Sequence, residues 1–542
     1  MSIIDTGDFF MQKRTATAFF SLMVVFGMLI VNLSYIVMQN TEVSDTVGTK
    51  SETVSTSRGG IYDRNLKPLV NTDKSYICYA LPSTEALKKL EPYLSKDEIS
   101  DIYEKMSDGK IIKFNCNHIF SENEVISVGT VNRYDRENLC RHLIGYLDGD
   151  GNGVAGLEKT YDSYLKMTGG KLTVSWGADA QSRILLGGKI NVTETNYTDG
   201  GGVALTIDKD FQSALQKIMN NSDIKVGAAV IMDSANSEIL ASCSLPSYDP
   251  LRVAEYLNKE NSPLINRANS AFSVGSVFKP FVAAAAMENG IDTEHYCNGI
   301  TYVGGKSFRC NNSVAHGKTT METAMEKSCN TYFIKLGQEV GAQKLLGICD
   351  GLGLGKSFEY EDGVYSAKGN LPKEEDLTSL SDLANLSFGQ GKLLATPWQM
   401  AAAYSAIANG GVYHTPVLMS AVLGENNEAI QRLVPDEGIR VISKETSERL
   451  DKILRSVVEN GTAKLGFTEK ARGCGKTATA QSGQIKDGRE ILHTWFCGYF
   501  TYKEKTYTVV ILKEDGTSGA KDCAPIFKTV TEGICDVIDE RK

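Results

Sequence analysis

A serine and a lysine stand one helical turn apart in the stretch FSVGSVFKPF, residues 272–281, as Ser276 and Lys279. Side chains three residues apart lie on one face of a helix, so the lysine is within reach of the serine hydroxyl. A neutral lysine amine can take the hydroxyl proton and make the serine a nucleophile for acyl transfer. The pattern is weak by itself. It also occurs at four other serines: Ser107, Ser163, Ser222 and Ser518.

The residues after Lys279 distinguish this pair from the other four. Pro280 fits a helix only in its first turn, where the backbone N–H groups have no intrahelical partner. The following FVAAAAM predicts a helix that packs closely on most sides. We therefore expect Ser276 and Lys279 in the first turn of a central helix, where burial lowers the pKa of the lysine.

Two further stretches carry side chains suited to the same reaction. EKSCNTYF places Ser328 and Asn330 near a helix end, and GCGKTATAQSG places Lys476, Thr477 and Thr479 on a predicted strand. A cation and two hydroxyls on one strand are suited to binding a carboxylate. The order Ser-x-x-Lys, Ser-x-Asn and Lys-Thr is the motif set of penicillin-binding proteins and class A β-lactamases.

With these motifs the sequence resembles the monofunctional class B penicillin-binding proteins, which are D,D-transpeptidases of peptidoglycan synthesis. The resemblance covers nearly the whole chain. RGGIYDRN, GLEKTYDSYL and ALTIDKDFQSAL are similar to the family's N-terminal part, and SLPSYDP, NRA, SFGQGKLLATPWQMAAAYSAIANGG, NGTA and HTWFCGY to its catalytic domain. The implied fold class is α+β. It is a penicillin-binding transpeptidase (serine β-lactamase-like) domain, with a five-stranded antiparallel sheet flanked by helices, on an elongated N-terminal pedestal.

The resemblance implies roles for the first two motifs. Ser276 is the acylated nucleophile and Lys279 its base, while Ser328 relays protons and Asn330 hydrogen-bonds the amide of the donor peptide. The implied reaction is attack on the penultimate D-alanine of a stem pentapeptide, release of the last D-alanine and transfer to an amine on a neighbouring strand. β-Lactams would acylate the same serine, and neither a cofactor nor a metal is expected.

The third motif supplies the remaining implied roles. Lys476 supports the electrostatics of the site, Thr477 and Thr479 bind the terminal carboxylate, and the N–H groups of Ser276 and Thr479 form the oxyanion hole. The family usually has Lys-Thr-Gly where this chain has Lys-Thr-Ala. Strand alternation places Ala478 on the face toward the serine helix, so its methyl group must fit in a crowded place.

The N-terminal region contains one long apolar stretch without a charge between Arg14 and Glu42. A helix over residues 15–38 would span about 36 Å at about 1.5 Å per residue, enough to cross a hydrocarbon core of about 30 Å. Lys13 and Arg14 precede it, which predicts a short cytoplasmic tail over 1–14 and the bulk of the chain outside a cell membrane.

The rest of the chain is predicted in three parts. Residues 39–57 read as a polar linker, 58–220 as the pedestal and 221–542 as the catalytic domain. In the last part, an apolar hairpin around DSANSE and two strands joined at YKEK are separated by helical tracts. A final helix begins at CAPIF. This arrangement predicts one mixed sheet in which the first and last segments join.

Charge and cysteine spacing exclude other functions. The net charge of −9 argues against nucleic-acid binding. The chain has twelve cysteines but no C-x-x-C pair, and its six histidines show no ligand spacing, so no zinc site is predicted. Cys297 and Cys310 are candidates for a bridge or a thiol pair, Cys329 and Cys474 for packed thiols. His316 and His493 are expected to shape the domain.

Two alternatives to the transpeptidase remain at this point: a β-lactamase or β-lactam sensor, and a catalytically weak scaffold for wall synthesis. A lactamase of class A needs a hydrolytic glutamate, which the sequence does not place. The resemblance also implies a SEDS-type membrane glycosyltransferase as partner, because only the pedestal is expected before the catalytic domain. Elongation, division and sporulation are equally open as the cellular role.

Overall fold

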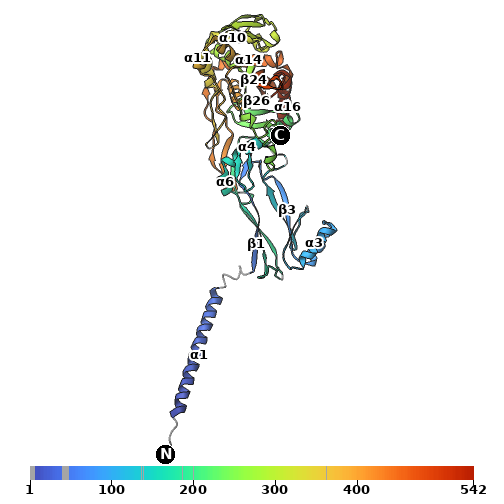
Figure 1. Cartoon of the computed structure of the whole chain (residues 1–542), viewed down its shortest axis with the longest axis vertical. Helices are drawn as coiled ribbons and strands as arrows, with labels where there is room; N and C mark the ends of the chain where they lie inside the picture. The colour runs from blue at the N-terminus through green and yellow to red at the C-terminus, as the bar shows by residue number, and fades with distance from the viewer. Residues whose placement is uncertain are drawn as a thin grey trace, which may run out of the picture. The chain divides into compact units, whose positions relative to one another are not determined.

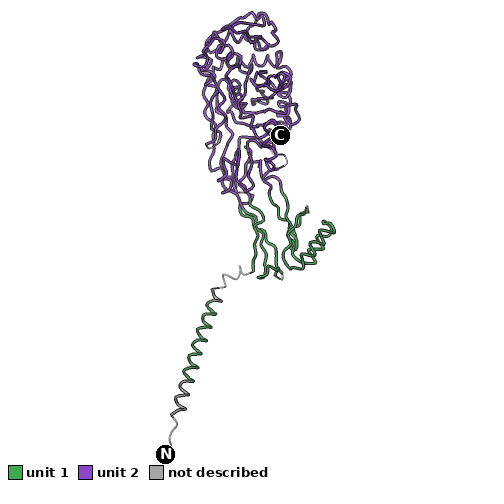
Figure 2. Tube along the Cα trace, in the orientation of Figure 1, with its two compact units in different colours: residues 1–56, 74–130, 171–195 green, residues 57–73, 131–170, 196–542 purple. Residues whose placement is uncertain are grey.

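The structure is a computed structural model that describes residues 6–39 and 48–541, except positions 117, 136, 138, 186, 199 and 362. It divides into two compact units (Figure 2). The first comprises residues 1–56, 74–130 and 171–195, and the second comprises 57–73, 131–170 and 196–542. Three segments from the sequence region 58–220, namely 58–73, 131–170 and 196–220, thus group with the larger unit. The predicted domain boundaries stay a prediction.

The first unit begins with helix α1 (Thr6–Gln39) (Figure 1). Its segment Thr15–Tyr35 has a mean hydropathy of 2.2 over its most apolar window and is long enough to cross a membrane. The large apolar side chains of this segment are exposed, as a lipid-facing surface requires. The helix predicted over 15–38 is therefore present, and its composition fits a membrane anchor.

The first unit also contains a three-stranded sheet in the order β1-β9-β10, all antiparallel. Its strands are β1 (Thr49–Thr56), β9 (Lys171–Gly177) and β10 (Ile190–Thr195). The linker prediction over 39–57 is wrong for Thr49–Thr56. This segment is rich in Thr, Ser and Val, and it pairs with β9, whose alternate residues are buried. Thr and Val favour the strand once such an edge is available. Residues 40–47 lie outside the described part.

A second sheet of the first unit has the strand order β4-β3-β6-β5, with α2 (Thr84–Leu90) and α3 (Lys96–Met106) beside it. The strands are β3 (Asp73–Ala80), β4 (Ile112–Asn115), β5 (Ser121–Glu122) and β6 (Val125–Asn132). Leu90 and Ile102 of the helices pack with Cys78 and Val125 of the strands in one buried cluster. This cluster is the core of that layer.

The second unit is built on a five-stranded sheet in the order β13-β12-β26-β25-β24. The first and last segments join in this sheet, as expected, because β12 pairs with β26. The sheet is not mixed, however, because every pairing in it is antiparallel. The strands are β12 (Gly227–Asp233), β13 (Ile239–Leu245), β24 (Arg472–Lys486), β25 (Arg489–Tyr502) and β26 (Lys505–Lys513).

Helices cover both faces of this sheet, as adjacent residues of β25 show. The Trp495 indole donates to the carbonyl of Ser273 at the start of the serine helix (2.9 Å), whereas Phe496 stacks on Phe527 at 4.1 Å. Successive side chains of a strand point to opposite faces. One face therefore carries α7 (Lys209–Asn220) and α16 (Ala524–Glu540), and the other carries α8 (Lys279–Glu288), α10 (Asn330–Val340), α13 (Pro397–Ala408) and α14 (Lys444–Glu459) (Figure 1).

Candidate active site

Ser276 lies in a short 3-10 turn, Gly275–Phe278, that leads directly into α8. Pro280 occupies the first turn of α8, and the residues from Lys279 to Ala286 are all buried. Gly275 has a left-handed φ of +61° and donates its N–H to the Gly389 carbonyl (2.9 Å). A Cβ at this position would lie 3.0 Å from Cβ of Ala480. The predicted buried helix start is confirmed, and glycine is required just before the serine.

Lys279 joins the first two motifs. Its side chain is fully buried, and its Nζ donates to the Ser328 carbonyl (2.8 Å), to Ser328 Oγ (3.1 Å) and to Asn330 Oδ1 (2.7 Å). Burial lowers the pKa of Lys279 to about 7. Among the described residues no carboxylate pairs with it. A substantial neutral fraction therefore exists near neutral pH, as a general base requires.

The second motif is held in a strained turn between α9 (Met321–Glu326) and α10. Ser328 has a φ of +55°, which is uncommon outside glycine and costs about 1–3 kcal/mol. Asn330 opens α10, and its Nδ2 donates to the Arg309 carbonyl (2.8 Å) while its Oδ1 accepts from Lys279. Both ends of the Asn330 amide are thereby oriented.

The third motif lies on β24 and brings a second buried lysine. The Lys476 side chain is fully buried, and its Nζ donates to the Thr477 carbonyl (2.9 Å) and to Thr462 Oγ1 (3.4 Å). Burial holds its pKa well below the ordinary range, and the nearby Lys279 lowers it further. Thr477 Oγ1 donates to Thr462 Oγ1 as well (3.2 Å). Thr462 belongs to the NGTA stretch but was not predicted as a site residue.

A cavity of about 490 Å³ brings together Ser276, Asn330 and Thr479 from the three motifs. The other predicted residues are not among those that line it. Lys279 and Ser328 connect to the cavity through Asn330, and Lys476 and Thr477 share Thr462. The rest of the lining was not predicted as site residues, although Phe388, Gln390 and Gln481 lie in stretches that the sequence analysis quoted: Lys306, Ser307, Phe308, Arg309, Asn385, Phe388, Gln390 and Gln481. The result is a polar cleft that Ser276 borders.

Ala478 faces the backbone of the turn Gly275–Phe278, as strand alternation predicted. Its Cβ lies 3.5 Å from the place that a Cβ on Gly275 would take, and the residue is only 4% exposed. It is not among the residues that line the cavity. The space left by the missing side chain of Gly275 accommodates the methyl group of Ala478, which therefore packs beside the turn and does not line the cleft.

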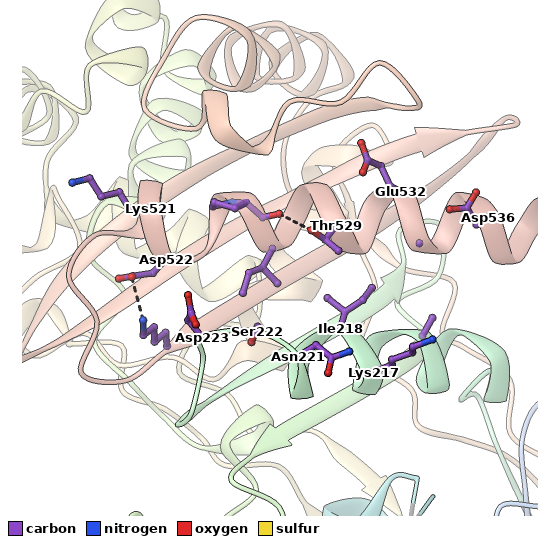
Figure 3. A pocket seen from close by; sticks show the side chains of 15 residues that line it. Lys217, Ile218, Asn221, Ser222, Asp223, Lys521, Asp522, Thr529, Glu532 and Asp536 are labelled. Atoms are coloured by element: carbon purple, nitrogen blue, oxygen red, sulfur yellow. Dashed lines mark hydrogen bonds and ion pairs between the residues drawn. The ribbon is translucent and has the colours of Figure 1, made fainter.

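A larger cavity of about 700 Å³ lies between α7 and α16 on the other face of the sheet. Residues from both helices line it, among them Ile218, Thr529 and Glu532 (Figure 3). None of the predicted catalytic or binding residues contributes to it. Size therefore does not identify the site; the convergence of three motifs identifies the smaller cleft.

Residues 227–532 match the family defined by the penicillin binding protein transpeptidase domain. Stage V sporulation protein D of Bacillus subtilis is 31% identical over 380 residues, which is 67% of this chain and 56% of that protein. Penicillin-binding protein PbpB of Mycolicibacterium smegmatis is 30% identical, over 74% of this chain and 64% of that protein. Peptidoglycan D,D-transpeptidase MrdA of Haemophilus influenzae is 26% identical, over 96% and 91%.

Solved structures show the same fold. Penicillin binding protein 3 from Mycobacterium tuberculosis, complexed with aztreonam, superposes with a TM-score of 0.64 at 24% identity, covering 90% of this chain and 97% of that one. The D,D-transpeptidase domain of a peptidoglycan glycosyltransferase from Eggerthella lenta gives 0.63 at 24% identity, covering 89% and 99%. The expected transpeptidase fold is confirmed.

The fold, the three motifs and the matched region together define the class of this protein. The chain belongs to the penicillin-binding protein transpeptidase family, as its sequence predicted. It spans 56% and 64% of the length of two of the relatives that it matches.

Proposed function

We propose that this protein is a membrane-anchored serine D,D-transpeptidase that cross-links peptidoglycan stem peptides through an acyl-enzyme on Ser276 and is acylated there by β-lactams. The observation that carries the proposal is the buried Lys279, which is hydrogen-bonded to both Ser328 and Asn330 behind the cleft that Ser276 borders. The names of two relatives, one a penicillin-binding protein and one a peptidoglycan D,D-transpeptidase, support the substrate class.

In the proposed first step, neutral Lys279 takes the proton of Ser276 as Oγ attacks the carbonyl carbon of the penultimate D-alanine. An O–C bond forms, and the C–N bond to the last D-alanine breaks. The departing amine needs a proton, which Ser328 delivers from Lys279, to which its Oγ is hydrogen-bonded at 3.1 Å. Lys279 is neutral again at the end of this step.

In the second step the amine of a neighbouring strand attacks the ester carbonyl. A C–N bond forms and the O–C bond breaks. The proton that the amine loses passes through the Lys279 and Ser328 pair to Ser276 Oγ. We assign the developing negative oxygen to the N–H groups of Ser276 and Thr479. Thr479 borders the cleft and we propose that it binds the terminal carboxylate. Thr477 would act with it, and Lys476, whose Nζ donates to the Thr477 carbonyl, would support the electrostatics of the site.

Fluorescent penicillin labelling of the full chain in detergent tests the nucleophile. We expect one label per chain on the tryptic peptide that contains Ser276, and none in Ser276→Ala. Ser107→Ala is the matched control, because Ser107 has the same Ser-x-x-Lys pattern and is exposed. Labelling that survives Ser276→Ala would overturn the assignment of the nucleophile.

Two further readouts separate the transpeptidase from its alternatives. A stem pentapeptide thioester analogue with an amine acceptor should yield a cross-linked product and free leaving group in equal amounts. A penicillin adduct that hydrolyses within minutes would indicate a β-lactamase, and a stable adduct without any acceptor product would indicate a scaffold or sensor. Either result would overturn the proposed activity.

We further propose that α1 places its N-terminus in the cytoplasm and the rest of the chain outside the membrane. The sequence has Lys13 and Arg14 before the apolar segment and Glu42 and Asp45 after it, which favours this orientation. By the family resemblance we also propose a SEDS-type membrane glycosyltransferase as partner. Reporter fusions at both ends test the orientation, and detergent co-purification with α1 intact or replaced by another apolar helix tests the partner.

A further inference from the structure

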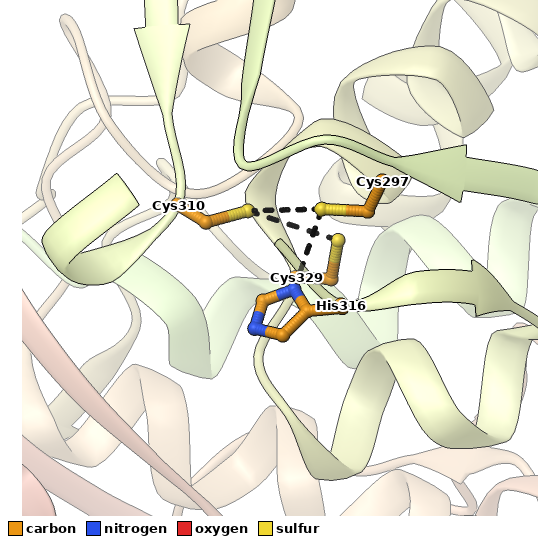
Figure 4. Close-up of side chains that lie close together, drawn as sticks. All are labelled: Cys297, Cys310, His316 and Cys329. Atoms are coloured by element: carbon orange, nitrogen blue, oxygen red, sulfur yellow. Dashed lines mark hydrogen bonds between the residues drawn. The ribbon is translucent and has the colours of Figure 1, made fainter. Parts of the chain in front are cut away.

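Four side chains that can each supply one metal ligand converge beside the second motif: Cys297, Cys310, His316 and Cys329 (Figure 4). Their sulfur and nitrogen atoms all lie within 4.8 Å of one another. Cys297, Cys310 and Cys329 are buried, and His316 is half-buried. Among the described residues this is the one group of at least three such side chains that converges so closely.

Three of the six distances between these atoms match the edges of a metal-centred tetrahedron, and all six are within 4.8 Å. Zn²⁺ binds thiolate sulfur at about 2.3 Å and imidazole nitrogen at about 2.0–2.1 Å, which sets tetrahedral S···S edges near 3.8 Å and S···N edges near 3.6 Å. In the structure Cys297 and Cys310 sulfurs are 3.7 Å apart, and those of Cys310 and Cys329 are 3.8 Å apart. The Cys297 sulfur lies 3.5 Å from His316 Nδ1.

The same distances separate this arrangement from a disulfide. A disulfide bond requires sulfur atoms about 2.05 Å apart, whereas all three cysteines are free thiols and Cys310 lies equally near two others. Backbone N–H groups can also face the sulfurs, as that of Gly299 does by donating to Cys297 (3.3 Å). Such donors stabilise bound thiolates.

We propose that Cys297, Cys310, His316 and Cys329 bind one zinc ion in a closed tetrahedral site. Three thiolates and one imidazole are a ligand set that favours Zn²⁺ over the oxygen-seeking Mg²⁺ and Ca²⁺. On binding, the three thiols release three protons and the imidazole binds in its neutral form. Four protein ligands leave no open position for water or substrate, so the ion is structural and takes no part in bond making.

The zinc site would connect two segments that border the cleft. This role in the active site rests on the proposed function. Cys329 lies between Ser328 and Asn330, the two residues that accept hydrogen bonds from Lys279. Cys310 directly follows β16 (Lys306–Arg309), whose residues line the cleft. One ion would therefore fix the second motif to the wall of the cleft, and it would help to hold the left-handed backbone of Ser328 in place.

Metal content tests the proposal directly. The full chain is purified in detergent through a tag that does not bind metals, and zinc is measured by plasma mass spectrometry beside protein concentration. We expect about one zinc per chain in the wild type. Because loss of even an indirect supporting contact costs about 10–100-fold in metal affinity, Cys310→Ser and His316→Ala should each lose zinc at least about tenfold under a fixed chelator concentration. The matched control is Cys349→Ala, a buried thiol outside the group, which should keep its zinc.

Cobalt exchange gives a readout that does not depend on activity. Co²⁺ in the wild type should show the intense visible absorption of a tetrahedral site with sulfur-to-metal charge transfer, and Ser276→Ala should show the same spectrum. Failure of penicillin labelling with a normal cobalt spectrum would count against the proposed function and leave the metal site intact. A folded wild type without zinc, an octahedral cobalt spectrum, or unchanged zinc in both Cys310→Ser and His316→Ala would overturn the metal site.

Discussion

Replacement of Gly275 by alanine should both destabilise the larger unit and slow its acylation. The residue has a φ of +61°, a conformation that costs an L-residue about 1–2 kcal/mol. The new Cβ would lie 3.0 Å from Cβ and 3.2 Å from Cα of Ala480, and crowding of this kind costs about 1–3 kcal/mol. Together the two effects lower the free energy of unfolding by about 3 kcal/mol.

The other end of the same helix offers a control that separates the two effects. Gly290 has nearly the same φ, +66°, but a Cβ there would meet nothing within 4 Å. Gly290→Ala should therefore show the backbone effect alone, about 1–2 kcal/mol. The difference between the two variants measures the contact with Ala480, and Ala480→Gly should recover part of it in the double variant.

Thermal unfolding and penicillin acylation measure the two consequences. At about 2 °C per kcal/mol for a large domain, Gly275→Ala should lower Tm by about 6 °C and Gly290→Ala by about 2–4 °C. Because Ser276 follows directly, a displacement of about 1 Å should slow acylation by about 10²-fold in Gly275→Ala. Gly290→Ala should acylate normally. Equal loss of stability in the two variants, or normal acylation of Gly275→Ala, would refute the reasoning.

Three further results are expected. The rate of acylation should rise about tenfold per pH unit below pH 7 and level off above it, because the pKa of Lys279 is about 7 and only the neutral amine accepts the proton. A flat stopped-flow profile from pH 5.5 to 8.5 would exclude Lys279 as the base. Thr462→Val keeps the shape of the side chain but removes the oxygen that accepts hydrogen bonds from Lys476 and Thr477. The free energy of unfolding should fall by about 1–3 kcal/mol and the acylation rate by about tenfold, and Thr462→Ser should restore both. Ala478→Gly removes a buried methyl outside the cleft, so Tm should fall by the equivalent of about 1–2 kcal/mol while the acylation rate stays within about twofold.

Local sequence signals predict the position of Ser276 at the start of α8 and much of its surroundings. Pro280 and the alanine run fixed the start of α8, because a proline ring and small side chains restrict both the position and the burial of a helix. Strand alternation placed Ala478 toward that helix correctly. Each of these features depends on residues within one or two turns of one another, which a linear sequence displays directly.

Features that depend on contacts between distant segments were missed. Thr462 joins the site only because the segment after α14 lies beside β24, and no spacing in the sequence records that contact. The group of Cys297, Cys310, His316 and Cys329 has 12, 5 and 12 intervening residues, unlike the short ligand pairs of zinc fingers, and so gave no signal. The strand Thr49–Thr56 was mistaken for a linker because its partner, β9, lies more than a hundred residues later.

The order of strands in the five-stranded sheet has a consequence for biogenesis. β12 lies between β13 and β26, and β26 (Lys505–Lys513) is the strand made last. The two strands of the first hairpin, which ends at Leu245, must therefore wait for about 260 residues of chain before β26 begins and the sheet can close. Such long-range pairing folds slowly and leaves an apolar strand edge open meanwhile. We expect the emerging chain to depend on holding chaperones until its C-terminal strands arrive, and a chain truncated before residue 505 to be degraded rather than partly active.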